Sequence, residues 1–267
     1  MQNCEPFVDI HCHLIPQIDD GSKSWDETLA MARMAVDDGI STIVVTPHQL
    51  GAYAHNDGDD IRFRTAQLQQ FLRQHDVPLD VLPGADVRIE ADMIAKLRQG
   101  SVLSLGDHRR HVLLELPHEL YFPLEPILDE LEALGMLGIL SHPERNQGLL
   151  SEPRLIEPLV DRGCWMQVTA GSLLGTFGPS SLQMSQWLLK QGLVHFIATD
   201  AHGSKQRRPL MGRAFQRIAE LADEETALEL CCRNPAAVAE GRDLQAAPRL
   251  QVKQRGWTNW FSARKAA

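Results

Sequence analysis

The residues of this chain best suited to binding metal ions are histidines and carboxylates that end hydrophobic segments. Near the N-terminus, the segment FVDIHCH ends in His11 and His13. Alternate side chains of a strand point to the same face, so Asp9, His11 and His13 are predicted to share one face. Two neutral imidazoles held side by side can bind zinc, manganese or iron. The pair alone would also fit two surface histidines, so the remaining segments decide between the two interpretations.

Ligand-type residues also follow most of the later hydrophobic segments. They are His48, Asp86, Glu115, His142, Asp200 and His202. Single residues of this kind are common as caps and turn formers, but their repetition at the ends of successive strands favours a metal centre. Glu115 supports this interpretation, because it lies inside the hydrophobic run LLEL and its burial without a cation would cost several kcal/mol.

The elements that must position these residues are strands alternating with helices. The predicted strands cover residues 7–13, 41–48, 79–86, 111–116, 136–145, 164–169 and 193–202. The predicted helices cover residues 24–39, 60–75, 91–98, 124–134, 154–162, 180–190, 210–221 and 224–232, and the first begins at a capping box, Ser24-x-x-Glu27. Strict alternation predicts a parallel sheet, and about seven strand–helix units favour a barrel. The strand ends of such a barrel converge on one face, which would bring the ligand-type residues into one cleft.

Composition narrows the class of protein. The 267 residues carry a formal net charge of -9, which makes the chain a poor candidate for binding nucleic acid or an anionic membrane. The five cysteines are odd in number and form no Cys-x-x-Cys pair, which argues against a disulfide framework. The N-terminus lacks signal-peptide features, and no apolar stretch is long enough for a membrane span. The sequence therefore predicts a reduced, cytoplasmic protein.

The chemistry expected from this ligand set is hydrolysis. The number of predicted ligands exceeds what one ion needs, because a catalytic zinc takes about three protein ligands. Two or three ions are therefore predicted. The absence of cysteine from the set favours manganese, iron or zinc. Arg145, Arg207 and Arg208 follow the ligand positions, and guanidinium groups match phosphate oxygens, which indicates a phosphoester substrate. Arg145 could instead pair with Glu144 or with a helix end.

The chain resembles the PHP (polymerase and histidinol phosphatase) superfamily in an ordered set of motifs. They are DIHCH at 9–13, TPH at 46–48, GAD at 84–86, LE at 114–115, SHPER at 141–145 and TDAH at 199–202. The loop IDDGSKS at 18–24 and the HPER segment look most like the manganese-dependent protein-tyrosine phosphatases of bacterial capsule and exopolysaccharide biosynthesis. The similarity covers about Val8 to Leu244.

The resemblance implies a distorted (β/α)7 TIM-like barrel of the PHP type over residues 1–244, with a centre of two or three Mn²⁺ ions and phosphotyrosine as the substrate. The implied metal ligands are His11, His13, His48, Asp86, Glu115, His142, Asp200 and His202. Asp20 would be a further ligand or a proton donor, and Arg145 with Arg207 or Arg208 would hold phosphate. One departure is Asp86, since the family usually has glutamate there.

The residues beyond the resemblance form a tail at 245–267 that is basic and aromatic, with Trp257, Trp260 and Phe261 between cationic residues. Such a tail fits contact with an anionic membrane surface or a partner, but a disordered or packing tail is the favoured interpretation.

The function predicted from the sequence is a protein-tyrosine phosphatase acting on a tyrosine-phosphorylated bacterial kinase of polysaccharide export. The alternatives are a small-molecule phosphatase of histidinol-phosphate type and a non-catalytic metal-binding scaffold, which the shorter carboxylate of Asp86 would favour. The sequence leaves open the metal identity, the partner kinase and the oligomeric state, a homo-oligomer included.

Overall fold

The structure is a computed structural model in which residues 5–244 are described. The predicted tail at 245–267 lies outside the described residues, as do residues 1–4. Within the described part, no helix combines the length and the apolar character that crossing a membrane requires.

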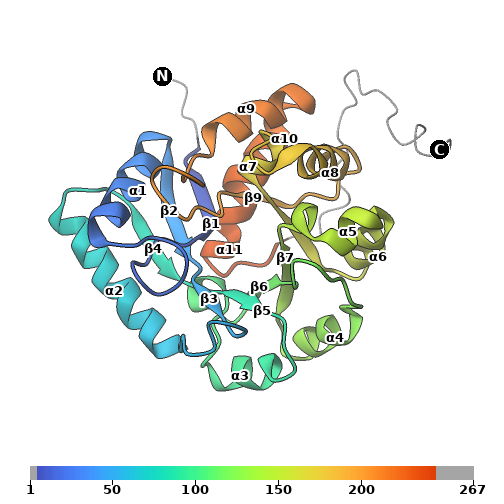
Figure 1. Cartoon of the computed structure of the whole chain (residues 1–267), viewed down its shortest axis with the longest axis horizontal. Helices are drawn as coiled ribbons and strands as arrows, with labels where there is room; N and C mark the ends of the chain where they lie inside the picture. The colour runs from blue at the N-terminus through green and yellow to red at the C-terminus, as the bar shows by residue number, and fades with distance from the viewer. Residues whose placement is uncertain (1–4, 245–267) are drawn as a thin grey trace.

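Parallel strands form the centre of the molecule (Figure 1). Their bounds are β1 (Phe7–Cys12), β2 (Ile40–Val45), β3 (His48–Gln49), β4 (Asp80–Pro83), β5 (Asp86–Arg88), β6 (His111–Glu115), β7 (Leu137–Ser141), β8 (Trp165–Thr169) and β9 (Phe196–Ala198). One sheet has the order β1-β2-β4 and the other the order β3-β5-β6-β7-β8-β9. All named strand pairs are parallel, which confirms the predicted class of sheet.

The two sheets form one distorted barrel because two strands bend and pass from one sheet to the other. β2 continues into β3 after Thr46-Pro47, and β4 continues into β5 after Gly84-Ala85. The ring returns to its start where His13 N donates to Ala201 O at 2.9 Å and Asp200 N donates to His11 O at 2.7 Å. If each bent strand counts as one, seven strands follow one another around the described chain, as the sequence predicted.

Helices surround the strands (Figure 1). The longer ones are α1 (Trp25–Asp37), α2 (Gly58–Gln74), α3 (Met93–Gln99), α4 (Glu125–Ala133), α8 (Gly178–Lys190) and α9 (Gly212–Leu221). The shorter ones are α5 (Gln147–Ser151), α6 (Ile156–Asp161), α7 (Ala170–Leu173), α10 (Glu224–Leu228) and α11 (Asn234–Ala239), with a π-helical turn at Glu229–Arg233. Ser24 caps the first helix as predicted, because its Oγ accepts a hydrogen bond from Glu27 N at 3.2 Å. The return bond of the capping box is shifted by one residue, since Glu27 Oε2 accepts from Lys23 N at 2.9 Å.

The hydrophobic core has two parts. The inner part fills the ring with strand residues such as Ile10, Leu113 and Phe196, and Val238 of α11 belongs to it. The outer part lies between the strands and the surrounding helices. Strands buried on both faces read as continuous hydrophobic runs, which is why a polar residue inside such a run was informative. Burial of each large aliphatic side chain contributes about 1.5–3 kcal/mol, so the strand frame is the stable part of the molecule.

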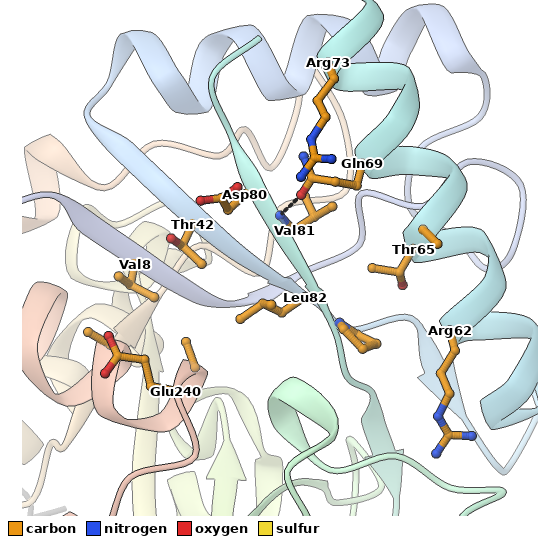
Figure 2. Close-up of a pocket in the computed structure, with 14 residues that line it drawn as sticks. Val8, Thr42, Arg62, Thr65, Gln69, Arg73, Asp80, Val81, Leu82 and Glu240 are labelled. Atoms are coloured by element: carbon orange, nitrogen blue, oxygen red, sulfur yellow. Dashed lines mark hydrogen bonds between the residues drawn. The ribbon is translucent and has the colours of Figure 1, made fainter.

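A pocket beside β4 opens next to this inner core (Figure 2). It has a volume of about 560 Å³ and lies among β4, α2 and α11. Val8 and Leu82 supply apolar lining, and Gln69 of α2 accepts a hydrogen bond from Val81 N at 2.9 Å. None of the predicted site residues lines it.

Candidate metal centre

The eight predicted ligands lie together at the C-terminal ends of the strands, and Asp20 joins them. Their donor atoms form four overlapping groups, each with all atoms within 4.8 Å of one another. The groups are His13, Asp20, His48 and His202; His11, His142 and Asp200; His11, His13 and Asp86; and His48, Asp86 and Glu115. Shared members connect the groups, so the side chains form one continuous cluster.

His11 and His13 at the end of β1 form the floor of this cluster. Their Nε2 atoms lie 3.2 Å apart, and each ring is oriented through its other nitrogen. His11 Nδ1 lies 2.8 Å from Gln167 Oε1, and His13 Nδ1 lies 2.7 Å from Asp19 Oδ2. Such partners fix the ring and leave Nε2 free to bind a metal.

Simple alternation along β1 grouped Asp9 with His11 and His13, and the structure separates Asp9 from their donor groups. Asp9 does not join the cluster; it accepts hydrogen bonds from the backbone and hydroxyl of Thr199 at 3.0 and 2.5 Å. The pairing of β1 with β2 shifts register between Asp9 and Cys12, so the strict two-residue period does not hold there. Asp9 therefore ties β1 to the end of β9.

The loop from Asp19 to Gly21 folds back onto His13. A Cβ at Gly21 would lie 2.4 Å from the carbonyl oxygen of His13, so only glycine permits this approach. Asp19 accepts hydrogen bonds from Gly21 N at 2.9 Å and from His48 N at 3.0 Å. Asp20 is thereby placed with Oδ1 3.5 Å from His48 Nε2 and 3.4 Å from His202 Nε2.

Asp86 is the most informative carboxylate of the cluster. It is fully buried, and neither of its oxygens has a hydrogen-bond partner among the described residues. Oδ2 lies 3.5 Å from His11 Nε2 and 3.4 Å from His48 Nδ1. Glu115 lies next to it, 3.7 Å from the same nitrogen of His48. A buried carboxylate without hydrogen bonds is costly, and a bound cation would supply the missing interaction.

His142 and Asp200 are held in an unusual backbone conformation. Their φ angles are 34° and 50°, in the left-handed region that residues other than glycine rarely adopt. Asp200 Oδ1 lies 3.3 Å from His11 Nε2 and 3.6 Å from His13 Nε2. Strain of this kind costs about 1–3 kcal/mol and is concentrated at functional sites.

Burial lowers the pKa of two imidazoles of the cluster, and neighbouring carboxylates outweigh burial and raise the pKa of two others, His48 and His11, the latter to about 9 through Asp200 and Asp86. Burial lowers the pKa of His13 to about 4 and the pKa of His142 well below its usual value, so both rings are neutral and able to bind a metal. Burial would also lower the pKa of His48, but the Asp86 and Glu115 carboxylates outweigh it and raise that pKa to about 10. Burial and the neighbouring Asp86 raise the pKa of Glu115 to about 7. A bound cation would take over the charge balance that these protons provide, so metal binding should release protons.

Two of the three predicted arginines reach the cluster. Arg145 and Arg207 both pair with Asp200 Oδ2, the latter at 2.5 Å. Phe177 lies beneath both guanidinium groups, with its ring centroid 4.3 Å from Arg145 and 5.9 Å from Arg207. Arg208 lines a neighbouring pocket instead. The structure thus selects Arg207 over Arg208 as the cluster residue.

Arg145 does not pair with Glu144, which was the alternative considered from the sequence. Glu144 is buried and accepts hydrogen bonds from Thr169 N at 3.0 Å and Ser172 Oγ at 2.7 Å. It therefore fixes the turn that carries His142 and Arg145. The cleft above the cluster has a volume of about 220 Å³ and is lined by both arginines, His142 and Asp200.

Three residues that shape the cluster were not predicted from the sequence as site residues. They are Asp19, Gln167 and Phe177. Gln167 carried a usable signal, since it is a polar residue within the buried strand WMQVT, like Glu115 in its own strand. Phe177 carried none, because an aromatic residue before a helix is most often part of a core.

The chain was compared with known proteins. A family model described as capsular polysaccharide synthesis, CpsB/CapC, matches residues 7–240. The chain belongs to the CpsB/CapC family. It is 38% identical over 203 residues to the tyrosine-protein phosphatase YwqE of Bacillus subtilis. The aligned residues cover 75% of this chain and 79% of YwqE. It is 29% identical over 253 residues to the putative tyrosine-protein phosphatase CapC of Staphylococcus aureus, covering 94% and 98% of the two chains.

A solved structure agrees with the family assignment. Crystal structures of YwqE from Bacillus subtilis and CpsB from Streptococcus pneumoniae, described as unique metal-dependent tyrosine phosphatases, include a chain that superposes with a TM-score of 0.86. The match has 32% sequence identity and covers 93% of this chain and all of the other. The predicted resemblance and fold class are confirmed. The predicted enzyme class, protein-tyrosine phosphatase, is the one by which these CpsB/CapC relatives are named.

Proposed function

We propose that this CpsB/CapC protein is a metal-dependent phosphatase that hydrolyses phosphotyrosine in proteins. The observation that carries the proposal is the position of two guanidinium groups, Arg145 and Arg207, at the edge of a cluster of metal-ligand side chains. A phosphate placed between the arginines and the cluster would meet cations on both sides.

The residues present fit a centre of two or three ions. Nine side chains offer imidazole or carboxylate donors in four overlapping groups, and buried Asp86 has no hydrogen-bond partner within residues 5–244. No cysteine belongs to these groups, so a harder ion such as Mn²⁺ suits them, and Fe or Zn would also be accepted. When bound, such ions lower the pKa of water and neutralise the charge of a phosphate.

The side chains around the centre divide the remaining work. Arg145 and Arg207 bind phosphate oxygens in place of Asp200 Oδ2, and Phe177 keeps both guanidinium groups at the edge of the cleft. Asp20 is half exposed between His48 and His202. The hydrogen bond from His202 holds the pKa of Asp20 well below its usual value, which favours its role as a metal ligand over that of a proton donor.

The substrate class is supported by relatives named tyrosine-protein phosphatases, and the family model that matches the chain is described as capsular polysaccharide synthesis. We infer a tyrosine-phosphorylated protein, and specifically a bacterial tyrosine kinase of polysaccharide export, as the partner. The cleft of about 220 Å³ is matched to a phosphate group more than to a whole peptide, so the tyrosine ring and its chain would lie across the mouth.

The proposal is tested by assaying metal-free and Mn²⁺-loaded protein on a phosphotyrosine peptide, a phosphoserine peptide and histidinol phosphate. We expect turnover that depends on metal and prefers phosphotyrosine. His142→Ala should lower kcat/KM by at least about 100-fold, because a ligand at the strained end of β7 is lost. His75→Ala, which removes an exposed histidine near the end of α2, is the matched control and should change kcat/KM by less than about twofold.

The outcomes separate the candidates. A preference for histidinol phosphate would replace the proposal by a small-molecule phosphatase. Metal binding without turnover of any phosphoester would support a non-catalytic scaffold. Equal activity of the His142→Ala and His75→Ala variants would remove the cluster from the mechanism.

A further inference from the structure

A second pocket adjoins the metal-ligand cleft. It has a volume of about 560 Å³, and Arg207 lines both it and the cleft. Its cationic lining is formed by Lys205, Arg207, Arg208 and Arg213, and none of the described residues that line it is acidic. Phe177 forms part of its wall. We call it the basic pocket.

Three of the four cations in the basic pocket have no acidic partner in the part of the chain that the structure describes. Lys205, Arg208 and Arg213 are exposed, and no carboxylate in residues 5–244 lies within 4.0 Å of their charged groups. The whole chain has a net charge of -9, so the positive charge of this pocket is opposite in sign to the net charge of the protein. Like charges gathered in one place repel one another, and an anionic ligand would relieve that repulsion.

Two carboxylates that contact the chain around the loop bond to its backbone. Asp38 Oδ2 accepts hydrogen bonds from Met211 N at 2.5 Å and Gly212 N at 2.7 Å. Glu27 Oε2 accepts one from Lys23 N at 2.9 Å, and Oε1 faces Ser204 N. These carboxylates fix the backbone on both sides of the loop and form no ion pair within 4.0 Å with Lys205, Arg208 or Arg213.

The loop itself is closed by its own backbone. His202 N donates to Arg207 O at 2.9 Å, and Arg207 has a φ of 48°. This turn directs Arg207 to Asp200, while Lys205 and Arg208 line the basic pocket. The cations therefore stand on a defined turn next to the cleft.

We propose that the basic pocket is a subsite for a second anionic group on the same phosphotyrosine peptide. The inference rests on the proposed function and deepens it. A peptide whose phosphate reaches Arg207 enters the basic pocket with its neighbouring residues, since an extended chain advances about 3.3–3.6 Å per residue. Guanidinium groups bind carboxylate and phosphate with the same fork, so the anion is an Asp or Glu side chain or a second phosphate.

The test compares kcat/KM for matched phosphotyrosine peptides on the Mn²⁺-loaded protein. One peptide has alanine at the three positions on each side of the phosphotyrosine, one has aspartate before it, one has aspartate after it, and one carries a second phosphotyrosine. We expect at least one anionic peptide to be preferred roughly 5- to 10-fold over the alanine peptide, which is the size expected of a few exposed ion pairs. The preference should shrink towards one in 0.5 M NaCl, because salt screens exposed charges.

Variants assign the preference to the basic pocket. K205Q combined with R213Q should lower the ratio between anionic and alanine peptides to less than about twofold, whereas Arg213→Lys should keep most of it. Arg217→Gln is the matched control, because Arg217 lies one turn further along α9, pairs with Glu220 and does not line the pocket. It should leave the ratio unchanged.

The outcomes distinguish a failure of the proposed function from a failure of the subsite. Absence of turnover on every phosphotyrosine peptide would overturn the proposed function. Turnover with equal kcat/KM on all peptides, or a ratio that persists in the K205Q/R213Q variant, would overturn the subsite alone. The ratio for aspartate against the second phosphotyrosine identifies which anion the basic pocket takes.

Discussion

The metal-ligand cleft and the pocket beside β4 contrast in size and in chemistry. The pocket beside β4 is larger, at about 560 Å³ against about 220 Å³. Around it, Gln69 bonds both Val81 N and Leu79 O, and Arg62 pairs with Asp107 at 2.6 Å. In the cleft, both oxygens of Asp86 lack such partners.

The contrast separates a cavity whose polar groups are satisfied from a smaller cleft whose buried carboxylate is not. Buried polar groups are almost always satisfied in a folded chain, and folding alone accounts for the groups beside β4. In the cluster, imidazoles and carboxylates are buried against one another. A bound cation would supply the interactions that Asp86 lacks among the described residues.

The largest effect is expected from substitution of Asp86, the carboxylate of the metal-ligand cleft that lacks hydrogen-bond partners among the described residues. Asp86→Asn keeps the shape and removes the charge that a cation would bind. We expect loss of bound metal and a fall of at least about 100-fold in kcat/KM, measured by elemental analysis and by phosphotyrosine turnover. Asp86→Glu retains a carboxylate and is the control. Full metal loading of Asp86→Asn would contradict the contrast.

A smaller effect is expected from two glutamines that are held by hydrogen bonds, Gln167 beside the metal-ligand cleft and Gln69 beside the β4 pocket. Gln167→Leu frees the ring of His11 and should lower metal affinity or kcat/KM by about 10- to 100-fold. Gln69→Leu removes two backbone contacts and should cost about 1–2 kcal/mol in the free energy of unfolding, with kcat/KM within about twofold. Similar losses of activity in both variants would show that the two cavities are functionally coupled.

The smallest effect is expected from His111, which lies outside the cluster but resembles Asp86 in lacking hydrogen-bond partners among the described residues. His111 at the start of β6 is buried away from the cluster, yet neither ring nitrogen has a partner among residues 5–244. Burial lowers its pKa from 6.5 to about 4. The unfolded chain therefore takes up the proton first as the pH falls, so this residue costs stability between pH 6.5 and about 4 and none above.

His111→Leu removes that dependence. Relative to the original protein, the variant should gain roughly 2 kcal/mol between pH 8 and pH 5 in the free energy of unfolding, measured by denaturant titration at both pH values. Phosphotyrosine turnover should stay within about twofold. A difference in stability that is the same at both pH values would contradict the lowered pKa of His111.

The sequence predicted the frame and the ligand cluster because both follow from a simple physical pattern. Strands of a parallel barrel are hydrophobic on both faces, so polar residues at their ends or inside them, such as His48, Glu115 and His142, stand out. The first helix was readable from its cap at Ser24. These features depend on neighbours within a few residues.

What the sequence could not give depends on the path of the chain in space. The bends that divide residues 41–48 and 79–86 into two strands each were not predicted, nor was α11, which continues past Pro235 because proline is tolerated in the first turn of a helix. The choice of Arg207 over Arg208 rests on one positive φ angle. Adjacent residues of the same type cannot be told apart without it.

The junction between β1 and β9 has a consequence for how the protein is made. His11 and His13 meet Asp200 there, and the hydrogen bonds from Thr199 to Asp9 span 190 residues. On the ribosome, the first ligands emerge long before the last, and contacts between residues so distant along the chain form late in folding. The two donor groups that include Asp200 or His202 are therefore completed only when synthesis is nearly finished, and a prematurely terminated product would carry most of the helices without them.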